Sequence, residues 1–374
     1  MTRLFFVAGE SSGDIHGANL LRALRAARPG WEFEGLGGAR MAAAGMALRH
    51  DLAGKAIMGF AEVVRSLSFI RRLFNETRAR LEEIRPDALV LVDYPGFNLR
   101  LAGEAKKLGI PVVYYISPQV WAWKKRRIHT IARVVDKMLV ILPFEEEYYR
   151  RAGVPCVYVG NPLLDHVEGA ALQTEPAAPE APVVGLLPGS REMEIRRIAP
   201  VMLETARRLR AEMPGTVFEA PCVNDERAAQ LRALAGDLPL TVRVGGMAEV
   251  LSRARCCMVA SGTATLETAL FGVPLVIVYR MNPLTYQLAR RLVKVEHIGI
   301  VNLLAGRRVA PEFVQQEASP ERLLPAMKEL LADSPARRAM LDGFREVREL
   351  LGGPGASARA AAEIVQLVEE RKHG

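Results

Sequence analysis

Continuous apolar runs, separated by segments with helical periodicity, dominate the first half of the chain. These runs lie at residues 4–8, 88–92, 111–116 and 137–142. Strands without polar alternation are buried on both faces, as in a parallel sheet covered by helices. Residues 19–27 and 99–108 carry the helical pattern between them. The pattern therefore predicts an α/β domain over residues 1–165.

The second half repeats this alternation after a break. Residues 166–182 are rich in Ala, Pro and acidic side chains, and we interpret them as a linker. Strands are then expected at residues 183–187, 216–220, 240–244, 256–260 and 274–279. This predicts a second domain over residues 183–351. The fold class is α/β, with two Rossmann-like parallel-sheet domains facing a central cleft.

A helical tail follows the second domain. From residue 319 onward the pattern is helical throughout. The last helix, about residues 352–374, is expected to complete the first domain of its own chain or to swap to a partner.

Composition places the chain among soluble globular proteins. It has 374 residues, of which 50% are apolar and 25% charged. The chain lacks a run of about 20 apolar residues and a signal peptide, so we expect a cytoplasmic protein. The four cysteines lack metal-ligand spacing, which favours reduced core thiols. The net charge of +8 favours an anionic partner, although solubility alone also explains it.

Two common nucleotide fingerprints are missing. The glycine-rich stretch at residues 35–38 lacks the G-x-G-x-x-G spacing of dinucleotide-binding domains. Gly54 and Lys55 lack the remainder of a phosphate-binding P-loop. Neither an NAD-dependent dehydrogenase nor a P-loop NTPase is therefore predicted.

The first predicted strand runs into a turn with ionisable and hydroxyl side chains. Residues 8–14 read AGESSGD and include Glu10, Ser12 and Asp14, with His16 just beyond. Polar groups at the carboxyl end of a parallel strand favour a binding site. Helix capping by Ser12 or Asp14 is the simpler alternative.

Asp93 directly follows the apolar strand at residues 88–92. Catalytic carboxylates occupy such strand ends in open α/β sheets. Capping of the helix after Asn98 explains Asp93 equally well.

The second domain offers two candidate anion sites. Residues 187–191 read LPGSR, and Arg191 can bind phosphate through two parallel hydrogen bonds. In the second, Ser261, Gly262 and Thr263 open a helix, where backbone N–H groups favour an anion. Glu267 can accept hydrogen bonds from ribose hydroxyls, or it only completes a capping box.

Residues 57–74 are both apolar and basic. One helical face, including Ile70 and Phe74, is assigned to the core. Phe69 and Leu73 are expected on nearly the opposite face, beside Arg65 and Arg72. We interpret this second face as a docking surface for anionic membrane. A dimer contact is the alternative.

A short aromatic and basic cluster follows at residues 121–127. Such a mixture occurs in proteins that bind single-stranded nucleic acid, but one cluster is weak support. Contact with phosphate or with a lipid headgroup explains the cluster equally well. We do not expect nucleic acid as a partner.

Several of these motifs together resemble the lipid-A-disaccharide synthases. The resemblance rests on residues 8–14, 93–98 (DYPGFN), 117–123 (SPQVWAW), 187–191, 261–267 (SGTATLE) and 302–306 (NLLAG). It spans nearly the whole chain, and several of these blocks are specific to the family.

This resemblance implies an inverting, metal-independent GT-B glycosyltransferase without a cofactor. It would join UDP-2,3-diacylglucosamine to 2,3-diacylglucosamine 1-phosphate (lipid X) at the cytoplasmic face of the inner membrane. Asp93 matches the family's proposed general base. Glu10, Arg191, Glu267 and Asn302 match positions around the UDP-sugar. The lack of a D-x-D sequence agrees with chemistry that needs no metal. We also expect a homodimer.

Two rival functions remain at this point. One is another UDP-sugar enzyme of the same fold, such as a sugar 2-epimerase or a peptidoglycan-type transferase. The other is a non-catalytic protein that binds anionic lipid or nucleic acid through its basic surface.

Overall fold

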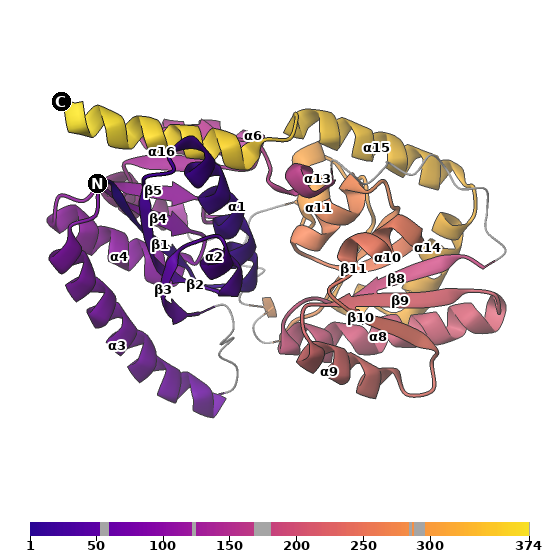
Figure 1. Cartoon of the computed structure of the whole chain (residues 1–374). Helices are drawn as coiled ribbons and strands as arrows, with labels where there is room; N and C mark the ends of the chain where they lie inside the picture. The colour runs from indigo at the N-terminus through magenta and orange to yellow at the C-terminus, as the bar shows by residue number, and fades with distance from the viewer. Residues whose placement is uncertain (53–59, 122–124, 168–180, 284–285, 288–295, 374) are drawn as a thin grey trace. The chain divides into compact units, whose positions relative to one another are not determined.

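The computed structural model describes residues 1–52, 60–121, 125–167, 181–283, 286–287 and 296–373. The chain divides into two compact units (Figure 1). Residues 1–165 and 353–374 form the first unit, and residues 166–352 form the second. Most of the predicted linker falls on residues 168–180, which lie outside the described residues. The predicted fold class, two parallel α/β units with a helical carboxyl-terminal segment, is confirmed.

A seven-stranded parallel sheet forms the centre of the first unit, in the order β3-β2-β1-β4-β5-β6-β7. Its strands are β1 Arg3–Ala8, β2 Glu32–Gly37, β3 Ala47–Asp51, β4 Ala88–Val92, β5 Val112–Tyr115, β6 Lys137–Val140 and β7 Cys156–Tyr158. Strands β2, β3 and β7 were not predicted. The strand order reverses between β1 and β4, which pair in register from Leu4 with Ala88 to Ala8 with Val92.

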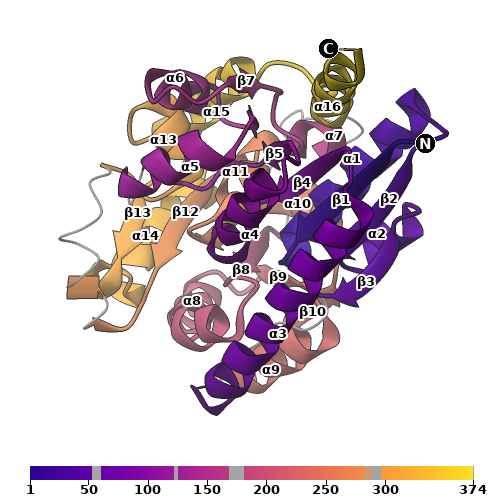
Figure 2. The same cartoon turned by 90° about the vertical axis from the view of Figure 1, so that its left-hand side faces the viewer.

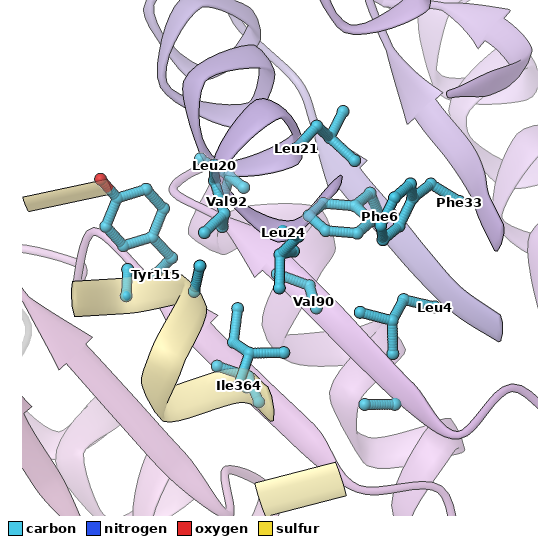
Figure 3. Close-up of a cluster of buried hydrophobic side chains, with 14 of the residues drawn as sticks. Leu4, Phe6, Leu20, Leu21, Leu24, Phe33, Val90, Val92, Tyr115 and Ile364 are labelled. Carbon is cyan, nitrogen blue, oxygen red and sulfur yellow. The ribbon is translucent and has the colours of Figure 1, made fainter. Parts of the chain in front are cut away.

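Helices cover both faces of this sheet. They are α1 Ser11–Ala27, α2 Ala39–Ala43, α3 Phe60–Ile84, α4 Pro95–Lys107, α5 Ile128–Val134, α6 Pro143–Arg151, α7 Leu163–Val167 and α16 Ala356–His373, with a 3₁₀ turn η1 at Lys125–Arg127. Because side chains alternate along a strand, Leu4 and Phe6 pack on one face with α1 and α16 (Figure 3). Phe5 and Val7 pack on the other face. Helices α3, α4 and α5 cover that face (Figure 2).

The last helix, α16, belongs to the first unit although its sequence follows the second. Asp165 accepts hydrogen bonds from the backbone N–H groups of Gly355 at 2.6 Å and Ala356 at 3.2 Å, at the start of α16. Arg359 Nε donates to the carbonyl of Val159 at 2.8 Å. Ile364 is fully buried beside Val90 (Figure 3). Apolar packing and a capped amino end thus fix this helix to the sheet.

The second unit has a six-stranded parallel sheet in the order β10-β9-β8-β11-β12-β13. Its strands are β8 Val183–Leu187, β9 Val217–Cys222, β10 Leu240–Val244, β11 Ala254–Ala260, β12 Leu275–Tyr279 and β13 Glu312–Val314. The helices are α8 Glu192–Glu212, α9 Asp225–Ala235, α10 Met247–Arg253, α11 Thr263–Leu270, α13 Ile300–Ala305, α14 Pro320–Leu331 and α15 Pro335–Leu351. Here the strand order reverses between β8 and β11.

Helix α3 departs from its prediction. Leu73 is only 3% exposed and belongs to the apolar core, while Phe69, Ile70 and Phe74 pack partly buried against the same cluster. The prediction that Phe69 and Leu73 form a separate exposed face is therefore wrong. The reason lies further along the helix, where Thr77 and Leu81 continue the Leu73 face at four-residue spacing and are also buried.

The predicted membrane surface also included Arg65 and Arg72. Arg72 is exposed. The side chain of Arg65 lies outside the described residues. Among the helices that the structure describes, none combines the length and the apolar character needed to cross a bilayer.

Burial of Leu73 predicts a loss of stability on truncation. Leu73→Ala is expected to lower the unfolding free energy of the first unit by about 2–5 kcal/mol, because a buried leucine leaves a cavity. All three tryptophans (Trp31, Trp121 and Trp123) lie in this unit, so urea unfolding followed by tryptophan fluorescence reports on it.

The neighbouring exposed residue provides the control. Arg72→Ala should change the unfolding free energy by no more than about 0.5 kcal/mol. Equal stability of the two variants would contradict the position assigned to Leu73.

Candidate functional site

The polar residues predicted at the first unit's strand ends meet at one edge of its sheet. Ala8 pairs with Val92, and Val92 pairs with Tyr115. The residues that follow these strands therefore emerge side by side. This edge includes the point between β1 and β4 where the strand order reverses, and ligands of open α/β sheets bind at such points.

The backbone at this edge is strained. Asp93, Tyr94 and Ile116 have positive φ angles of 46°, 49° and 63°. A left-handed conformation costs a non-glycine residue about 1–2 kcal/mol and persists only when its surroundings enforce it. Backbone strain of this kind gathers at functional sites.

Neighbouring side chains enforce the turn at Asp93. Its backbone N–H donates to the carbonyl of Tyr115 at 3.1 Å. Its carbonyl accepts from Asn98 Nδ2 at 2.7 Å and from the Tyr114 hydroxyl at 2.5 Å. Asn98 Nδ2 also faces the carbonyls of Val92 at 3.3 Å and Val7 at 3.4 Å. The half-buried Asp93 carboxylate thus projects from a fixed backbone.

Tyr94 joins the Asp93 turn to the Glu10 turn. A Cβ atom on Gly9 would lie 2.3 Å from the Tyr94 ring, so only glycine allows this approach. The ring stacks on Phe97 with centroids 5.9 Å apart. Burial, and secondly the charge of Glu10, raise the pKa of the Tyr94 hydroxyl. Glu10 and Asp93 therefore flank one aromatic side chain. Ser12 is exposed in the first turn of α1.

Asp14 has a structural task. Its carboxylate accepts hydrogen bonds from the N–H groups of Arg40 at 3.1 Å and Met41 at 3.0 Å, and it is 5% exposed. Asp14 therefore does cap a helix, as the alternative proposed, but that helix is α2 and not α1, which contains Asp14.

Sequence reasoning missed a buried carboxylate at the same edge. Glu145 in α6 is 1% exposed. Its Oε1 atom accepts from Ser117 Oγ at 2.7 Å and Trp121 Nε1 at 3.0 Å, and Oε2 accepts from the Leu142 N–H at 3.2 Å. Burial raises its pKa to about 7, against the lowering effect of these hydrogen bonds. Glu145 thus ties the loop after β5 to α6.

Only part of this arrangement was visible in the sequence. Residues 142–145 (LPFE) are a helix start, with proline in the first turn and glutamate at the third position. Ser117 and Trp121 lie 28 and 24 residues before Glu145, so their contacts with it appear only in the fold.

In the second unit, β8 and β11 end at the corresponding edge, where Leu187 pairs with Val259. Arg191 precedes α8, and its Nη1 donates to Glu194 Oε1 at 3.1 Å. Glu194 Oε2 accepts from the N–H groups of Ser190 at 3.0 Å and Arg191 at 3.1 Å. Two N–H groups of the LPGSR turn are therefore already hydrogen-bonded to the Glu194 carboxylate.

Helix α11 begins differently. Its N-cap is Gly262, and no side chain caps it. Within the described residues, the N–H groups of Thr263 and Ala264 have no hydrogen-bond acceptor. Ser261 Oγ donates to the carbonyl of Ile298 at 2.8 Å. The amino end of α11 therefore has free donors for an anion.

Glu267 lies in the second turn of α11 and does not cap the helix. It is half-buried, and burial raises the pKa of its carboxyl group. Within the part of the chain that the structure describes, no hydrogen-bond partner of this carboxylate is found. The capping-box alternative therefore does not apply.

Asn302 is fully buried, and its amide is used entirely within the protein. Nδ2 donates to the carbonyl of Ala310 at 2.8 Å and to Glu312 Oε1 at 2.9 Å. Oδ1 accepts from the N–H groups of Val309 and Ala310, each at 2.8 Å. In this conformation no hydrogen-bonding capacity is left for a ligand. Asn302 supports the loop, and direct contact with a UDP-sugar stays a prediction.

The predicted site residues thus form two groups. Glu10 and Asp93 lie at the same sheet edge of the first unit, on either side of Tyr94, with Ser12 in the Glu10 turn. Arg191, Ser261, Gly262 and Thr263 lie at the carboxyl edge of the second sheet, where the strand order reverses. Each group occupies the position where open α/β sheets bind ligands.

Comparison with known proteins identifies close relatives. The family model described as lipid-A-disaccharide synthetase matches residues 4–365. The lipid-A-disaccharide synthase of Trichlorobacter lovleyi is 45% identical, over 98% of this chain and 98% of the relative. That of Myxococcus xanthus is 44% identical, over 98% of this chain and 97% of the relative.

Solved structures share the fold at low identity. The kitacinnamycin glycotransferase has a TM-score of 0.63 at 19% identity, and covers 98% of each chain. S. aureus MnaA in a co-structure with UDP has a TM-score of 0.67 at 13% identity, and covers 97% of this chain and 96% of its own. At this identity the likeness concerns the fold alone.

The raised pKa of Glu145 predicts a pH-dependent stability. A carboxyl group with a pKa near 4.5 when unfolded and about 7 when folded stabilises the protein fully below pH 4.5. That contribution, about 3 kcal/mol, is lost as the pH rises to 7 and beyond. The neutral variant Glu145→Gln lacks this titration. Its unfolding free energy relative to wild type should therefore rise by about 3 kcal/mol between pH 4.5 and 8.

Urea unfolding at a series of pH values, followed by tryptophan fluorescence, measures this difference. Other groups that titrate in the range cancel when the two proteins are compared. Parallel stability curves would refute a buried, titrating Glu145.

Proposed function

Since this chain belongs to the lipid-A-disaccharide synthase family, we propose that it joins UDP-2,3-diacylglucosamine to 2,3-diacylglucosamine 1-phosphate (lipid X). The products are a β-1′,6-linked disaccharide and UDP. The observation that carries the proposal is the family match over residues 4–365, together with a relative that is 45% identical over 98% of both chains. The reaction is inverting and uses no divalent cation.

Asp93 acts as the general base. It takes the proton from the acceptor's 6-hydroxyl as that oxygen attacks the anomeric carbon, and the bond from this carbon to the UDP oxygen breaks. The support comes from its position at the switch point of the sheet and from the buried amide of Asn98, which fixes its backbone. A fixed backbone reduces the motion needed to reach the transition state.

The departing diphosphate is stabilised by the amino end of α11 and the Arg191 guanidinium. Negative charge grows on this group as the bond breaks, and oriented N–H donors stabilise it. The support is that the N–H groups of Thr263 and Ala264 have no acceptor among the described residues. At α8, the corresponding amides are already bound to Glu194. When UDP binds, the Arg191 guanidinium gives up its hydrogen bond to Glu194 and donates to the phosphate oxygens instead.

Glu267 is proposed to accept hydrogen bonds from the ribose hydroxyls. Its carboxylate is half-buried and lacks a hydrogen-bond partner among the described residues. Glu10 and Ser12 are proposed to contact the sugar of the donor. Their support is their match to the family motif and their place beside the Asp93 turn.

The protein is proposed to work as a peripheral protein on the cytoplasmic face of the inner membrane, and as a homodimer. Both proposed substrates carry two acyl chains, which keep them in a bilayer. Helix α3 exposes Arg71, Arg72 and Arg78, which can contact anionic lipid. With Leu73 in the core, this contact is electrostatic and not an insertion of that side chain.

A coupled assay tests the function. The purified protein is incubated in neutral detergent with both substrates and EDTA, and UDP and the disaccharide are measured together. Equal amounts of UDP and disaccharide are expected. A 2-epimerase would instead convert the donor without an acceptor. Absence of disaccharide, or strict dependence on Mg²⁺, would contradict the proposal.

Replacing the base predicts a selective loss of turnover. Asp93→Asn should lower kcat by about 100-fold or more, because general bases contribute about 10²–10⁴-fold. UDP affinity, measured by titration calorimetry, should be unchanged. Asp87→Asn is the matched control, since Asp87 precedes the strand that Asp93 follows and is paired with the N–H of Arg3. Full activity of the Asp93 variant would remove it from this role.

Removal of the Arg191 guanidinium is expected to weaken UDP binding. Arg191→Ala should raise the Kd for UDP by about 10- to 100-fold, since hydrogen bonds to charged groups are worth about 1.5–3 kcal/mol. Arg210→Ala, at the far end of the same helix, should bind UDP like wild type. Unchanged affinity of the Arg191 variant would exclude contact with the diphosphate.

A further inference from the structure

The proposed chemistry assigns no role to Arg127, which directly precedes α5. Arg127 ends the turn η1 and is half-buried. Among the residues whose side chains the structure describes, none forms a hydrogen bond or ion pair with it. Partly buried arginines are normally paired, because removing a charge from water is costly. With respect to the described side chains, Arg127 therefore keeps its hydrogen-bonding capacity for an anion.

Packing brings Arg127 to the side of the sheet where α4 begins. Helix α5 starts directly after Arg127 and lies beside α4, which starts after the Asp93-Tyr94 turn (Figure 2). Ile128 and Tyr94 pack against the same apolar cluster. Burial raises the pKa of the Tyr114 hydroxyl, and the charge of Asp93 raises it further, while Arg127 acts in the opposite direction. One buried tyrosine thus lies within electrostatic range of both residues.

The start of the segment that leads to Arg127 is firmly anchored. Glu145 binds Ser117 and the indole of Trp121. The Tyr149 hydroxyl donates to the carbonyl of Pro118 at 2.7 Å. The Trp121 ring packs edge-on against Phe144, with centroids 5.0 Å apart. Three side chains of α6 therefore hold the start of this loop. Ile128, just after Arg127, is partly buried against the apolar core.

We propose that the guanidinium of Arg127 binds the phosphate group of the acceptor substrate. This inference rests on the proposed function, in which the acceptor is a sugar 1-phosphate and Asp93 receives its proton. Guanidinium binds phosphate oxygens through two parallel hydrogen bonds, so one arginine both attracts and orients the acceptor. A phosphate monoester on the acceptor, rather than the phosphate of a bilayer lipid, is the assigned ligand.

The test compares two acceptors that differ only in this group. Wild type and Arg127→Gln are assayed in neutral detergent without phospholipid, with 2,3-diacylglucosamine 1-phosphate or with 2,3-diacylglucosamine. The variant should lose about 10- to 100-fold in kcat/KM on the phosphorylated acceptor. On the unphosphorylated acceptor the two proteins should be alike, so that the preference for phosphate disappears. UDP affinity should be unchanged.

Arg126→Gln is the matched control. Arg126 is adjacent and exposed, and this variant should keep the preference for the phosphorylated acceptor. An equal loss on both acceptors for Arg127→Gln, or loss of the preference in Arg126→Gln instead, would overturn the inference. So would a variant that binds phospholipid vesicles more weakly but discriminates between acceptors as wild type does.

Equilibrium binding of the phosphorylated acceptor provides a second measurement that needs no turnover. A wild type that makes no disaccharide from either acceptor would contradict the proposed function alone. Weaker acceptor binding by Arg127→Gln in that case would still support the phosphate contact, and equal binding would refute it.

Discussion

The position of the Asp93 carboxylate depends on one buried amide. Asn98 Nδ2 faces the carbonyls of Val7, Val92 and Asp93 at 2.7–3.4 Å, where β1 and β4 end. Carbonyl groups at strand ends lose their partners in the sheet and are costly to bury unpaired. By pairing them, Asn98 allows the chain to turn sharply within the protein. The Tyr114 hydroxyl adds a second hydrogen bond to the Asp93 carbonyl, and Gly9 leaves room for the Tyr94 ring beside this turn.

The two turns of the second unit that the sequence offered as anion sites differ in their contacts. Both follow buried strands, and both open a helix. In the LPGSR turn, the Glu194 carboxylate accepts a hydrogen bond from the Ser190 N–H and another from the Arg191 guanidinium. The second turn has glycine at the N-cap and no capping side chain. The proposed diphosphate site is therefore α11, with Arg191 at the neighbouring strand end.

The sequence predicted what depends on local pattern. The apolar runs identified β1, β4, β8 and β11, and hence the strand ends that carry Asp93 and Ser261. It failed where distant residues decide. Leu73 was misplaced because Thr77 and Leu81, which lie beyond residues 57–74, set the buried face of α3. Glu145 escaped notice because its partners precede it by more than 20 residues.

Other side chains were assigned from their motif, and only the fold reveals their contacts. Asp14 was considered a cap for its own helix, yet it caps α2 through Arg40 and Met41. Asn302 matches the family pattern, but its amide is bound within its own loop. Neither set of contacts has a signature at short range. The sequence showed that these residue types favour such roles, but it did not show which groups they would bind.

The stereochemistry of the product tests most directly whether the acceptor hydroxyl displaces UDP in a single step, as the role of Asp93 as general base requires. The anomeric configuration is read from the one-bond carbon–proton coupling in an NMR spectrum of the disaccharide formed from an α-linked donor. A single displacement predicts a β linkage. An α linkage would require retention, and would contradict the role given to the Asp93 carboxylate.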